Sequence, residues 1–577
     1  MRDGAQEFQT FGVKNFRYIE IQNCPVELTA DMIKGIGIQQ AFDWNDSYFI
    51  SSDDVLNEVW ELCKYTIKAS NQNMYVDSLT RERMPYEGDN YINQLTSFTV
   101  SRNYNLPRYS NMYVLYNPTW PAEYRMLAIQ STYNDYLYTG ETSVIEEYYE
   151  KLKENLLLSS DESEIDEETG LLRVTTAGDL RPIIDYPAAN RDGYDVDNTP
   201  YNTVVNSYLY YSLNLMAKMA DIIGKTSDAN EYREQAESVR TAMFDNLLDM
   251  SDGFFIEGLN SKREKVTGKA FATSIYPLLH NVVTDEIQQK NLSDFIAKDL
   301  MNGDRGNVYT AQFLLQAYYK MGKAQAGMDI LSGTGSKSWY NMIHKLNATM
   351  TTEKFDFDGL TFTFSHPWSS SAANVMVRDM MGVQPLEAAF DKIQIKPQTA
   401  DLESAEVKTP TIKGAVIVKT EKNTENAAYE LTTTTPANTT AKIYVPADIV
   451  SHNKVIVDGV AQDATREGNF FVFDNVGSGT HTFVVPYGPA LNLTTEGILR
   501  AGITTPLKID ITDGVSLSDA EISCSSSRED VLTAVPSESG CLFTLNKAGR
   551  STVTVNIKVP EVNIGGIKYI DHTLTQT

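Results

Sequence analysis

The 577-residue chain shows three successive patterns of apolar and polar positions. Residues 8–50 alternate apolar with polar residues, which is typical of β-strands, so we interpret residues 1–50 as the end of an N-terminal β-domain or a linker. Over residues 51–388 the apolar positions recur at helical spacing, most clearly from Tyr208 to Ile223, where Gly224 supplies a common helix end. The pattern therefore predicts a mostly helical central region.

From residue 389 the apolar positions recur at every second residue. Turn residues at intervals of about ten positions predict an antiparallel β-sandwich over residues 389–489. A second run, rich in Thr, Ser and Val, predicts a small Ig-like β-domain over residues 490–577. Cys524 and Cys541 flank an apparent hairpin there, and the sequence leaves open whether they form a disulfide bond.

The helical region should form an all-α domain rather than an α/β fold. Strands do not alternate with helices, so a parallel sheet is not expected. A helical solenoid should repeat at a fixed period, and the sequence shows none. Long loops rich in Asp, Gly, Pro and aromatic residues instead favour a toroid of paired helices, because one rim of such a ring has to build the site.

The charge of the chain narrows the choice of partners. There are 76 Asp and Glu residues against 49 Lys and Arg, which gives a formal net charge of −27. A surface this negative repels phosphate groups, so we expect neither nucleic acid nor a membrane as a partner. No apolar run reaches the length of about 18 to 20 residues that a membrane helix needs. The 32 Tyr residues suit sugar faces, although most should fill helix interfaces.

The motifs of several other enzyme classes do not occur in the sequence. There is no Gly-x-Ser-x-Gly, phosphate-binding loop, His-Glu-x-x-His or Cys-x-x-Cys. The chain has only six His residues, and they are scattered, so a metal site with several His ligands is not expected. We therefore expect chemistry performed by side chains alone, with no metal and no cofactor.

The densest group of polar residues is the segment 77–89, with the sequence DSLTRERMPYEGD. Pro85 and Gly88 disfavour a helix, so the segment is predicted to be a loop. Its composition alone favours a solvated surface, but the interleaved Met84 and Tyr86 favour an ordered loop. Glu82, between two arginines, would be held in a fixed position, and a general acid there would need burial or nearby carboxylates to keep its proton.

This loop resembles the acidic loop of bacterial α-L-rhamnosidases, glycoside hydrolase family 78. The shared residues are Asp77, Arg81-Glu82-Arg83, Gly88 and Asp89. Further segments resemble family motifs in the same order along residues 10–490: Asn15–Tyr18, Trp120–Glu123, Tyr138–Glu141, Ile184–Pro187 with Arg191–Tyr194, Asn347–Glu353 and Ser365–Ser369. The chain is therefore similar to this family over most of its length.

The resemblance implies an (α/α)6 barrel followed by a β-sandwich, and inverting hydrolysis of terminal α-L-rhamnosyl residues from oligosaccharides or glycosides. By position, Glu82 would be the general acid and Glu353 the general base. Only a closed barrel would bring two residues so far apart in the chain face to face. An inverting mechanism implies a distance of about 6.5 to 9.5 Å between the two carboxyl groups, which leaves room for the attacking water.

The resemblance also implies a set of residues around the sugar. Asp77 and Arg81 would bind its hydroxyl groups, Asp89 would add negative charge near the general acid, and His366 would be a further hydroxyl ligand. An aromatic wall is expected beside the methyl group of rhamnose. Its candidates are Tyr86, Trp120, Tyr186 and Trp368. Asp185 belongs to the acidic motif before Tyr186, and Glu123 is either a substrate ligand or an acid at a helix start.

Departures from the family pattern leave the sugar and the aglycone open. Ser78-Leu79 stands where the family has Cys-Pro, Pro85-Tyr86 where it has Gly-Trp, and Thr352 where it has Trp. Two alternatives therefore remain, namely an (α/α)6-barrel glycosidase of different sugar specificity and a catalytically inactive carbohydrate-binding relative. The oligomeric state is also open.

The start of the chain lacks the apolar stretch of a secretory signal, while residues 8–23 already alternate like a strand. We therefore expect a parent protein with more sequence upstream. A periplasmic or extracellular location is expected.

Overall fold

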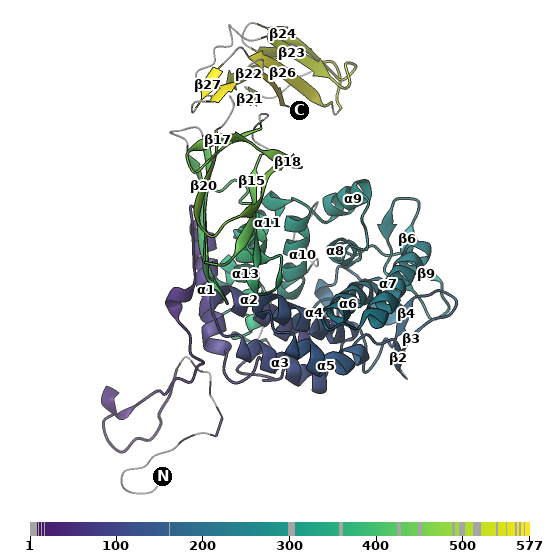
Figure 1. Cartoon of the computed structure of the whole chain (residues 1–577), viewed down its shortest axis with the longest axis vertical. Helices are drawn as coiled ribbons and strands as arrows, with labels where there is room; N and C mark the ends of the chain where they lie inside the picture. The colour runs from purple at the N-terminus through teal and green to yellow at the C-terminus, as the bar shows by residue number, and fades with distance from the viewer. Residues whose placement is uncertain are drawn as a thin grey trace. The chain divides into compact units, whose positions relative to one another are not determined.

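The computed structural model describes the following residues: 9, 11, 12, 14, 16, 18–160, 162–297, 306–356, 362–423, 428–447, 450, 453–486, 491–495, 502–511, 521–537, 540–549, 551–559, 562–564, 567–569 and 572–576. The chain divides into two compact units (Figure 1). The first comprises Met1–Leu402, Glu406–Ile417 and Thr435–Thr440. The second comprises Glu403–Ala405, Val418–Thr434 and Ala441–Thr577.

The N-terminal segment corrects the sequence prediction. Before residue 48, the described residues hold two 3₁₀ turns, Ala30–Met32 and Trp44–Asp46, and no strand. The first strand, β1, is Tyr48–Ser51. The predicted strands are thus wrong for the described part of this segment, where Ile19 is 56% exposed. Alternation permits a strand, but a strand also needs a neighbouring strand and a buried face, and this segment has neither among the described residues.

Residues 51–388 are mainly helical, as predicted. The α-helices that the structure describes are α1 Asp54–Ser70, α2 Glu87–Val100, α3 Asn105–Tyr116, α4 Ala122–Thr139, α5 Ser143–Glu154, α6 Thr203–Ile222, α7 Thr226–Leu247, α8 Ala272–Leu279, α9 Glu286–Ala297, α10 Val308–Lys320, α11 Ala324–Leu331, α12 Trp339–His344 and α13 Ser371–Val375. A π-helical turn, Met376–Met380, follows α13. The helix predicted from Tyr208 to Ile223 corresponds to α6 without its first five residues, and Gly224 follows it with a positive φ of 76°.

The helices differ in how many of their faces are buried. All residues of α2 are buried, and so are all residues of α10 except Lys320, so protein surrounds both helices. In contrast, α7 buries one stripe that includes Ala229, Tyr232 and Ala236. Six helices pack in sequence: α2 on α4, α4 on α6, α6 on α8, α8 on α10, α10 on α13, and α13 on α2. The helical unit therefore contains helices enclosed by protein and helices with one exposed face.

Short two- and three-residue strands lie in the loops between the helices. They are β2 Ser159–Ser160, β3 Ser163–Ile165, β4 Leu172–Val174, β5 Tyr201–Asn202, β6 Leu248–Asp249, β7 Phe254–Phe255, β8 Gly258–Leu259 and β9 Lys265–Val266. All pair antiparallel, for example β5 with β8 through Tyr201 and Leu259. Among the described residues, every helix is too short or too polar to cross a bilayer.

The region after the helices is rich in strands, as predicted. Its strands up to residue 486 are β10 Gln384–Pro385, β11 Lys392–Ile395, β12 Ser404–Thr411, β13 Gly414–Asn423, β14 Ala428–Thr435, β15 Thr440–Pro446, β16 Lys454–Val457, β17 Val460–Asp463, β18 Thr465–Glu467, β19 Phe470–Val476 and β20 Gly479–Pro486. In the second unit, β14, β20, β16 and β17 follow one another in one sheet, and β15, β19 and β18 in another. The burial pattern of β15 alternates at every residue, which matches the period of two in the sequence.

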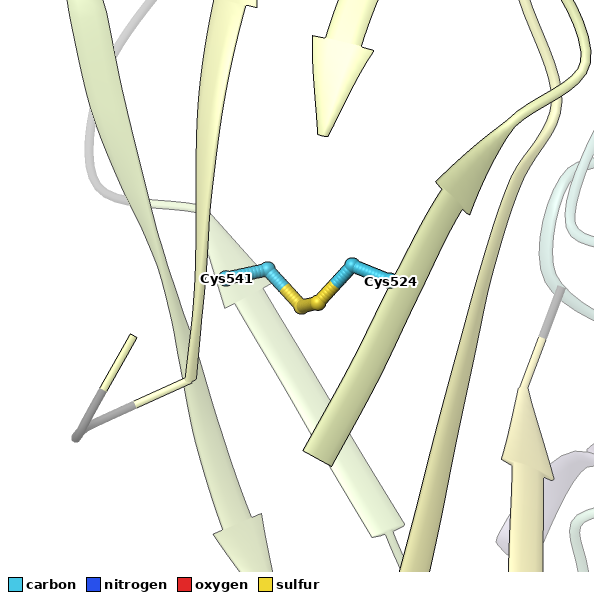
Figure 2. Close-up of a disulfide and its surroundings, with 2 residues drawn as sticks. All are labelled: Cys524 and Cys541. Carbon is cyan, nitrogen blue, oxygen red and sulfur yellow. A yellow bond between two sulfur atoms is a disulfide. The ribbon is translucent and has the colours of Figure 1, made fainter. Parts of the chain in front are cut away.

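The last strands of the second unit form further sheets. They are β21 Leu491–Thr495, β22 Thr504–Ile511, β23 Glu521–Ser526, β24 Leu532–Ser537, β25 Gly540–Leu545, β26 Val553–Val559, β27 Val562–Ile564, β28 Ile567–Tyr569 and β29 His572–Gln576. One sheet has the order β21-β22-β25-β24, another the order β23-β26-β29, and β27 pairs with β28. A disulfide bond joins Cys524 of β23 to Cys541 of β25, so it connects two different sheets (Figure 2). This bond answers the question that the sequence left open.

Candidate active site

A cavity of about 150 Å³ in the first unit contains most of the predicted site residues. Ten of them line it: Asp77, Arg81, Glu82, Tyr86, Asp89, Trp120, Tyr186, Glu353, His366 and Trp368. Three further lining residues, Pro121, Tyr124 and Ile183, were not singled out from the sequence. Segments that are far apart in the sequence therefore meet at one cavity. Two of these segments lie before or at the start of α2 and α4, and they supply most of the lining residues.

The loop before α2 is closed by hydrogen bonds between its ends. The backbone N–H of Asp77 donates to the carbonyl oxygen of Met84 at 2.9 Å, and the N–H of Met84 donates to Oδ1 of Asp77 at 2.8 Å. The Ser78 hydroxyl donates to the other carboxylate oxygen at 2.7 Å. Because these contacts hold both ends of the loop, Arg81 and Glu82 are presented together near its tip. Burial, and secondarily the charge of Asp89, raise the pKa of Asp77.

The Arg81 guanidinium lies between the two carboxylates that the sequence predicts to be catalytic. Its Nη2 is 2.6 Å from Oε1 of Glu353 and 2.9 Å from Oε1 of Glu82. Since both oxygens contact the same nitrogen, they are at most 5.5 Å apart, the sum of these two distances. Tyr186 is also hydrogen-bonded to Arg81. One cation therefore links the loop before α2 to the segment that carries Glu353.

The two carboxylates have different surroundings. The side chain of Glu82 is 38% exposed and accepts a hydrogen bond from the Tyr86 hydroxyl at 2.7 Å. The side chain of Glu353 is 1% exposed, and its Oε2 accepts the N–H of Thr363 at 2.9 Å. The Trp368 indole donates to the backbone oxygen of Glu353 at 3.1 Å. Glu353 is thus rigidly held, whereas Glu82 can reach solvent.

His366 connects the walls of the cavity. Its Nδ1 lies 2.9 Å from the Thr363 hydroxyl, and its Nε2 lies 3.2 Å from Oδ1 of Asp89. Burial lowers the pKa of His366 to about 4 and raises that of Asp89 to about 8. At neutral pH both groups are therefore uncharged, and the imidazole tautomer decides which of them donates the hydrogen bond.

Glu123 and Asp185 do not line the cavity, and their carboxylates bind backbone instead. Glu123 Oε1 accepts the N–H of Ile183 at 2.8 Å and that of Ile184 at 2.7 Å. Asp185 accepts the N–H of Asn307, at the start of α10, at 2.7 Å. These contacts position the loop that carries Tyr186. A direct role of either acid in substrate binding stays a prediction.

Glu87 and Gly88 are important for the local fold but were not identified from the sequence as site residues. The buried Glu87 carboxylate accepts the N–H of Thr119 at 2.9 Å, which positions the loop before Trp120. Gly88 was expected to break the helix, but it lies in the first turn of α2. A Cβ on Gly88 would overlap the ring of Tyr124. Close packing between α2 and α4, rather than a turn, explains this glycine.

The arrangement places two carboxylates, one buried and one accessible, at the wall of a cavity with aromatic sides. Such a pair can supply an acid and a base to one substrate. Among the described residues, no group of three or more His, Cys, Asp or Glu side chains is arranged to hold a metal ion. The chemistry that this cavity supports is acid–base chemistry on a small ligand with an apolar face.

Comparison with known proteins gives matches over most of the chain. Residues 45–109 and 103–380 match the bacterial alpha-L-rhamnosidase 6 hairpin glycosidase domain, and residues 382–456 match the bacterial alpha-L-rhamnosidase C-terminal domain. A curated alpha-L-rhamnosidase from Streptomyces avermitilis is 27% identical over 304 residues, which is 50% of this chain and 27% of that protein. One from Formosa agariphila is 23% identical over 481 residues, which is 78% of this chain and 49% of that protein. The chain thus spans half or less of the length of these relatives.

Solved structures show a similar fold. The alpha-L-rhamnosidase of Dictyoglumus thermophilum aligns with a TM-score of 0.64 at 18% identity, over 80% of this chain and 52% of that one. The Streptomyces avermitilis alpha-L-rhamnosidase complexed with L-rhamnose aligns with a TM-score of 0.59 at 20% identity, over 76% of this chain and 42% of that one. Since the two family models together cover residues 45–456 with little interruption, the chain belongs to the bacterial α-L-rhamnosidase six-hairpin glycosidase family.

Proposed function

We propose that this protein is an inverting exo-glycosidase that releases terminal α-L-rhamnosyl residues from oligosaccharides or glycosides. Glu82 is the general acid and Glu353 the general base. The observation that carries the proposal is that these two carboxylates, from distant parts of the chain, contact the same Arg81 nitrogen at the wall of one cavity. The relatives named above are alpha-L-rhamnosidases, which favours rhamnose as the sugar.

The exposure of the two carboxylates supports this assignment of roles. The accessible Glu82 suits protonation of a leaving group that extends toward solvent, and the buried Glu353 suits activation of a confined water molecule. The small volume of the cavity, about 150 Å³, favours a single terminal sugar over the interior of a polysaccharide chain. Asp77 and Arg81 bind the sugar hydroxyls, and the lining rings of Tyr86, Trp120, Tyr186 and Trp368 face its apolar side.

An inverting mechanism also requires the Arg81 guanidinium to move. The nearest oxygens of Glu82 and Glu353 are at most 5.5 Å apart while Arg81 bridges them. Inverting enzymes keep their carboxyl groups about 6.5 to 9.5 Å apart, and retaining enzymes about 5 to 5.5 Å. The proposal therefore includes a step in which the sugar and its water displace the bridging guanidinium and the exposed Glu82 moves outward. Proton NMR of the first product tests this step, because inversion releases β-L-rhamnose and retention releases the α-anomer.

The fold proposed with this function is an (α/α)6 barrel followed by a β-sandwich. It is supported by the packing of α2, α4, α6, α8, α10 and α13, in which the last helix contacts the first. We propose domain boundaries at residues 51–388, 389–489 and 490–577, with residues 1–50 preceding the barrel. A periplasmic or extracellular location is supported by the disulfide between Cys524 and Cys541, because such bonds persist in oxidising compartments.

Turnover of p-nitrophenyl glycosides tests the function. The wild type, Glu82→Gln and Glu353→Gln should be compared on the α-L-rhamnoside and on a panel of other p-nitrophenyl sugars. We expect rhamnoside turnover in the wild type, and a loss of about 10²- to 10⁴-fold in each variant, which is the usual contribution of a general acid or base. Sugar binding without turnover of any panel member would instead indicate an inactive carbohydrate-binding relative.

A second candidate is a six-hairpin glycosidase with another sugar specificity. It is favoured by the contact between the Tyr86 hydroxyl and Glu82, because the family pattern has Gly-Trp where this chain has Pro85-Tyr86. The same panel separates the two candidates. Turnover of a different glycoside, with none of the rhamnoside, and its loss in the same two variants would select the second.

A further inference from the structure

The first unit contains a second and larger cavity, of about 310 Å³, that the proposed reaction does not use. We call it the amide pocket, because six amide side chains line it: Gln130, Asn134, Gln316, Gln384, Gln394 and Gln398. Its other lining residues include the rings of Tyr91, Tyr211 and Tyr319. No residue that lines the cavity with Glu82 and Glu353 also lines the amide pocket.

A layer of aromatic side chains separates the two cavities. The ring centroid of Tyr309 is 5.6 Å from that of Trp368 in the first cavity and 5.2 Å from that of Phe313. Phe313 in turn stacks on Tyr91 of the amide pocket at 6.1 Å. Gln316 lies seven positions after Tyr309 along α10, which corresponds to about 10 Å of helix. The amide pocket is thus a separate site along the same helices.

The amide pocket has several buried polar atoms without a partner. Gln130 is 4% exposed and Tyr319 is 1% exposed, yet neither Nε2 of Gln130 nor the Tyr319 hydroxyl has a hydrogen-bond partner among the described residues. The same holds for Nε of Arg378 and Oδ2 of Asp379, both of which line this pocket. Buried polar atoms are paired with protein or ordered water in most folded proteins, so four unpaired atoms in the walls of one cavity favour a polar ligand there.

The kinds of unpaired atoms define the chemistry of that ligand. Gln130 and Arg378 offer N–H donors, Asp379 offers an acceptor, and the Tyr319 hydroxyl can act as either. Burial raises the pKa of Asp379 only to about 6, so at neutral pH its carboxylate is negative, while Arg378, Lys320 and Lys396 bring positive charges to the same pocket. A charged ligand would meet a like charge in this pocket, whereas a neutral molecule with several hydroxyl groups would satisfy donors and acceptors together.

The ammonium group of Lys320 is not available to bind an anionic ligand. Its ammonium group donates to the backbone oxygens of Leu278 and Leu279, at 2.8 and 2.7 Å, and to Oδ1 of Asn281 at 2.7 Å. These contacts use all three of its hydrogens. The ring of Tyr211 lies parallel to that of His280, at 4.8 Å between centroids, and completes a rigid aromatic side of the pocket.

We propose that the amide pocket is a second, non-catalytic binding site for a neutral monosaccharide. Its volume lies at the lower end of the range of about 300 to 1,000 Å³ for small-molecule pockets, which fits one sugar unit better than an oligosaccharide. Amides and charged side chains bind the hydroxyl groups, and the tyrosine rings face the apolar side of the sugar. This proposal does not depend on the reaction proposed for Glu82 and Glu353.

Binding to the full chain tests the proposal. The probes are L-rhamnose, D-glucose, D-galactose and D-mannose, with D-glucuronate as the charged control, observed by saturation-transfer NMR and titration calorimetry. The protein carries Glu353→Gln, so that nothing is turned over. We expect at least one neutral sugar to bind at a site whose affinity falls by about tenfold or more in Tyr319→Phe and in Gln130→Leu.

Tyr318→Phe is the matched control. Tyr318 neighbours Tyr319 on α10, but its hydroxyl donates to the backbone oxygen of Ile296 at 2.6 Å, and it does not line the pocket. It should leave sugar binding unchanged. In a wild-type background, Tyr319→Phe should also leave glycoside turnover unchanged. The proposal is overturned if no neutral sugar binds, if binding is equal in Tyr319→Phe, Gln130→Leu and Tyr318→Phe, or if glucuronate binds more tightly than every neutral sugar.

Discussion

Arg81 and Glu353 form an ion pair across 272 positions of the sequence, with 2.6 Å between Nη2 and Oε1. The same nitrogen lies 2.9 Å from Glu82, so the position of one guanidinium sets the distance between both proposed catalytic carboxylates. Arg81 is 36% exposed and Glu353 1% exposed, which means that the arginine can move away while Glu353 stays in place.

Arg81→Lys should lower kcat/KM for the preferred glycoside by about 10- to 100-fold, because a small displacement of catalytic groups has effects of this size. A lysine ammonium is a point charge on a flexible stem and cannot present to the sugar hydroxyls the fixed donors of a planar guanidinium. Initial-rate kinetics measure the effect. Arg83→Lys is the control, since Arg83 is on the same loop but does not line the cavity, and its kcat/KM should stay near that of the wild type. Equal kinetics of both variants would exclude this role for Arg81.

Asp89→Asn should become more stable relative to the wild type as the pH rises. Burial raises the pKa of Asp89 to about 8, so the folded protein keeps a proton that the unfolded chain loses above its ordinary value of 3.8. Between these two values the wild type loses about 1.4 kcal/mol of stability per pH unit at this residue, and Asn has no proton to lose.

Calorimetric unfolding at several pH values between about 5 and 8 measures this difference. The difference in stability, variant minus wild type, should rise steadily over this range. If Asp89 were ionised in the folded protein, its carboxylate would titrate below this range in both the folded and the unfolded chain and would add no pH dependence between about pH 5 and 8. A difference that stays level or falls as the pH rises would therefore contradict a protonated Asp89.

Glu123→Ala should destabilise the protein by at least about 2 kcal/mol, because it leaves the buried N–H groups of Ile183 and Ile184 without an acceptor. Glu123→Gln keeps an acceptor oxygen at the same place and should be close to the wild type. Thermal unfolding compares the three proteins. KM should rise in the Ala variant as well, since the loop from Ile183 carries Tyr186. Equal stability of the Ala and Gln variants would show that the loop does not depend on this carboxylate.

Loss of the disulfide bond should lower the stability of the second unit only. Under non-reducing, denaturing conditions a thiol assay should detect Cys24 and Cys63 but neither Cys524 nor Cys541. The bond closes a loop with a sequence separation of 17, so replacing both bonded cysteines by Ala should lower the stability of this unit by about 3 kcal/mol. Glycoside turnover should not change, because the proposed site belongs to the first unit. Four reactive thiols in the untreated protein would contradict the bond.

Helices and the period of the C-terminal strands could be predicted well from the sequence. Most of α6 was predicted from its apolar spacing, and β15 shows the predicted alternation of buried and partly exposed residues. Both patterns are local, since a helix or a strand with one buried face repeats at its own period. The strands predicted before Tyr48 failed for the converse reason, because no local pattern states whether a partner strand is present.

The residues of the candidate site could be predicted from motifs, but their individual roles could not. The family resemblance selected Glu82, Glu353 and His366, and all three line one cavity. It also selected Asp185, and Glu123 as either a substrate ligand or an acid at a helix start, yet their carboxylates bind backbone N–H groups. A motif gives the residue type and its order in the chain, whereas the direction of a side chain depends on the helices packed around it.

The sequence by itself determined the family, the helical centre, the strand-rich end and the residue types available for acid–base chemistry. Only the tertiary structure decided that Arg81 bridges Glu82 and Glu353, that Cys524 pairs with Cys541, and that an aromatic layer separates two cavities. The physical reason is that periodicity and motifs are properties of neighbouring residues in the chain. Contacts between distant residues arise instead from packing, which buries one polar group against a partner and leaves another facing a cavity.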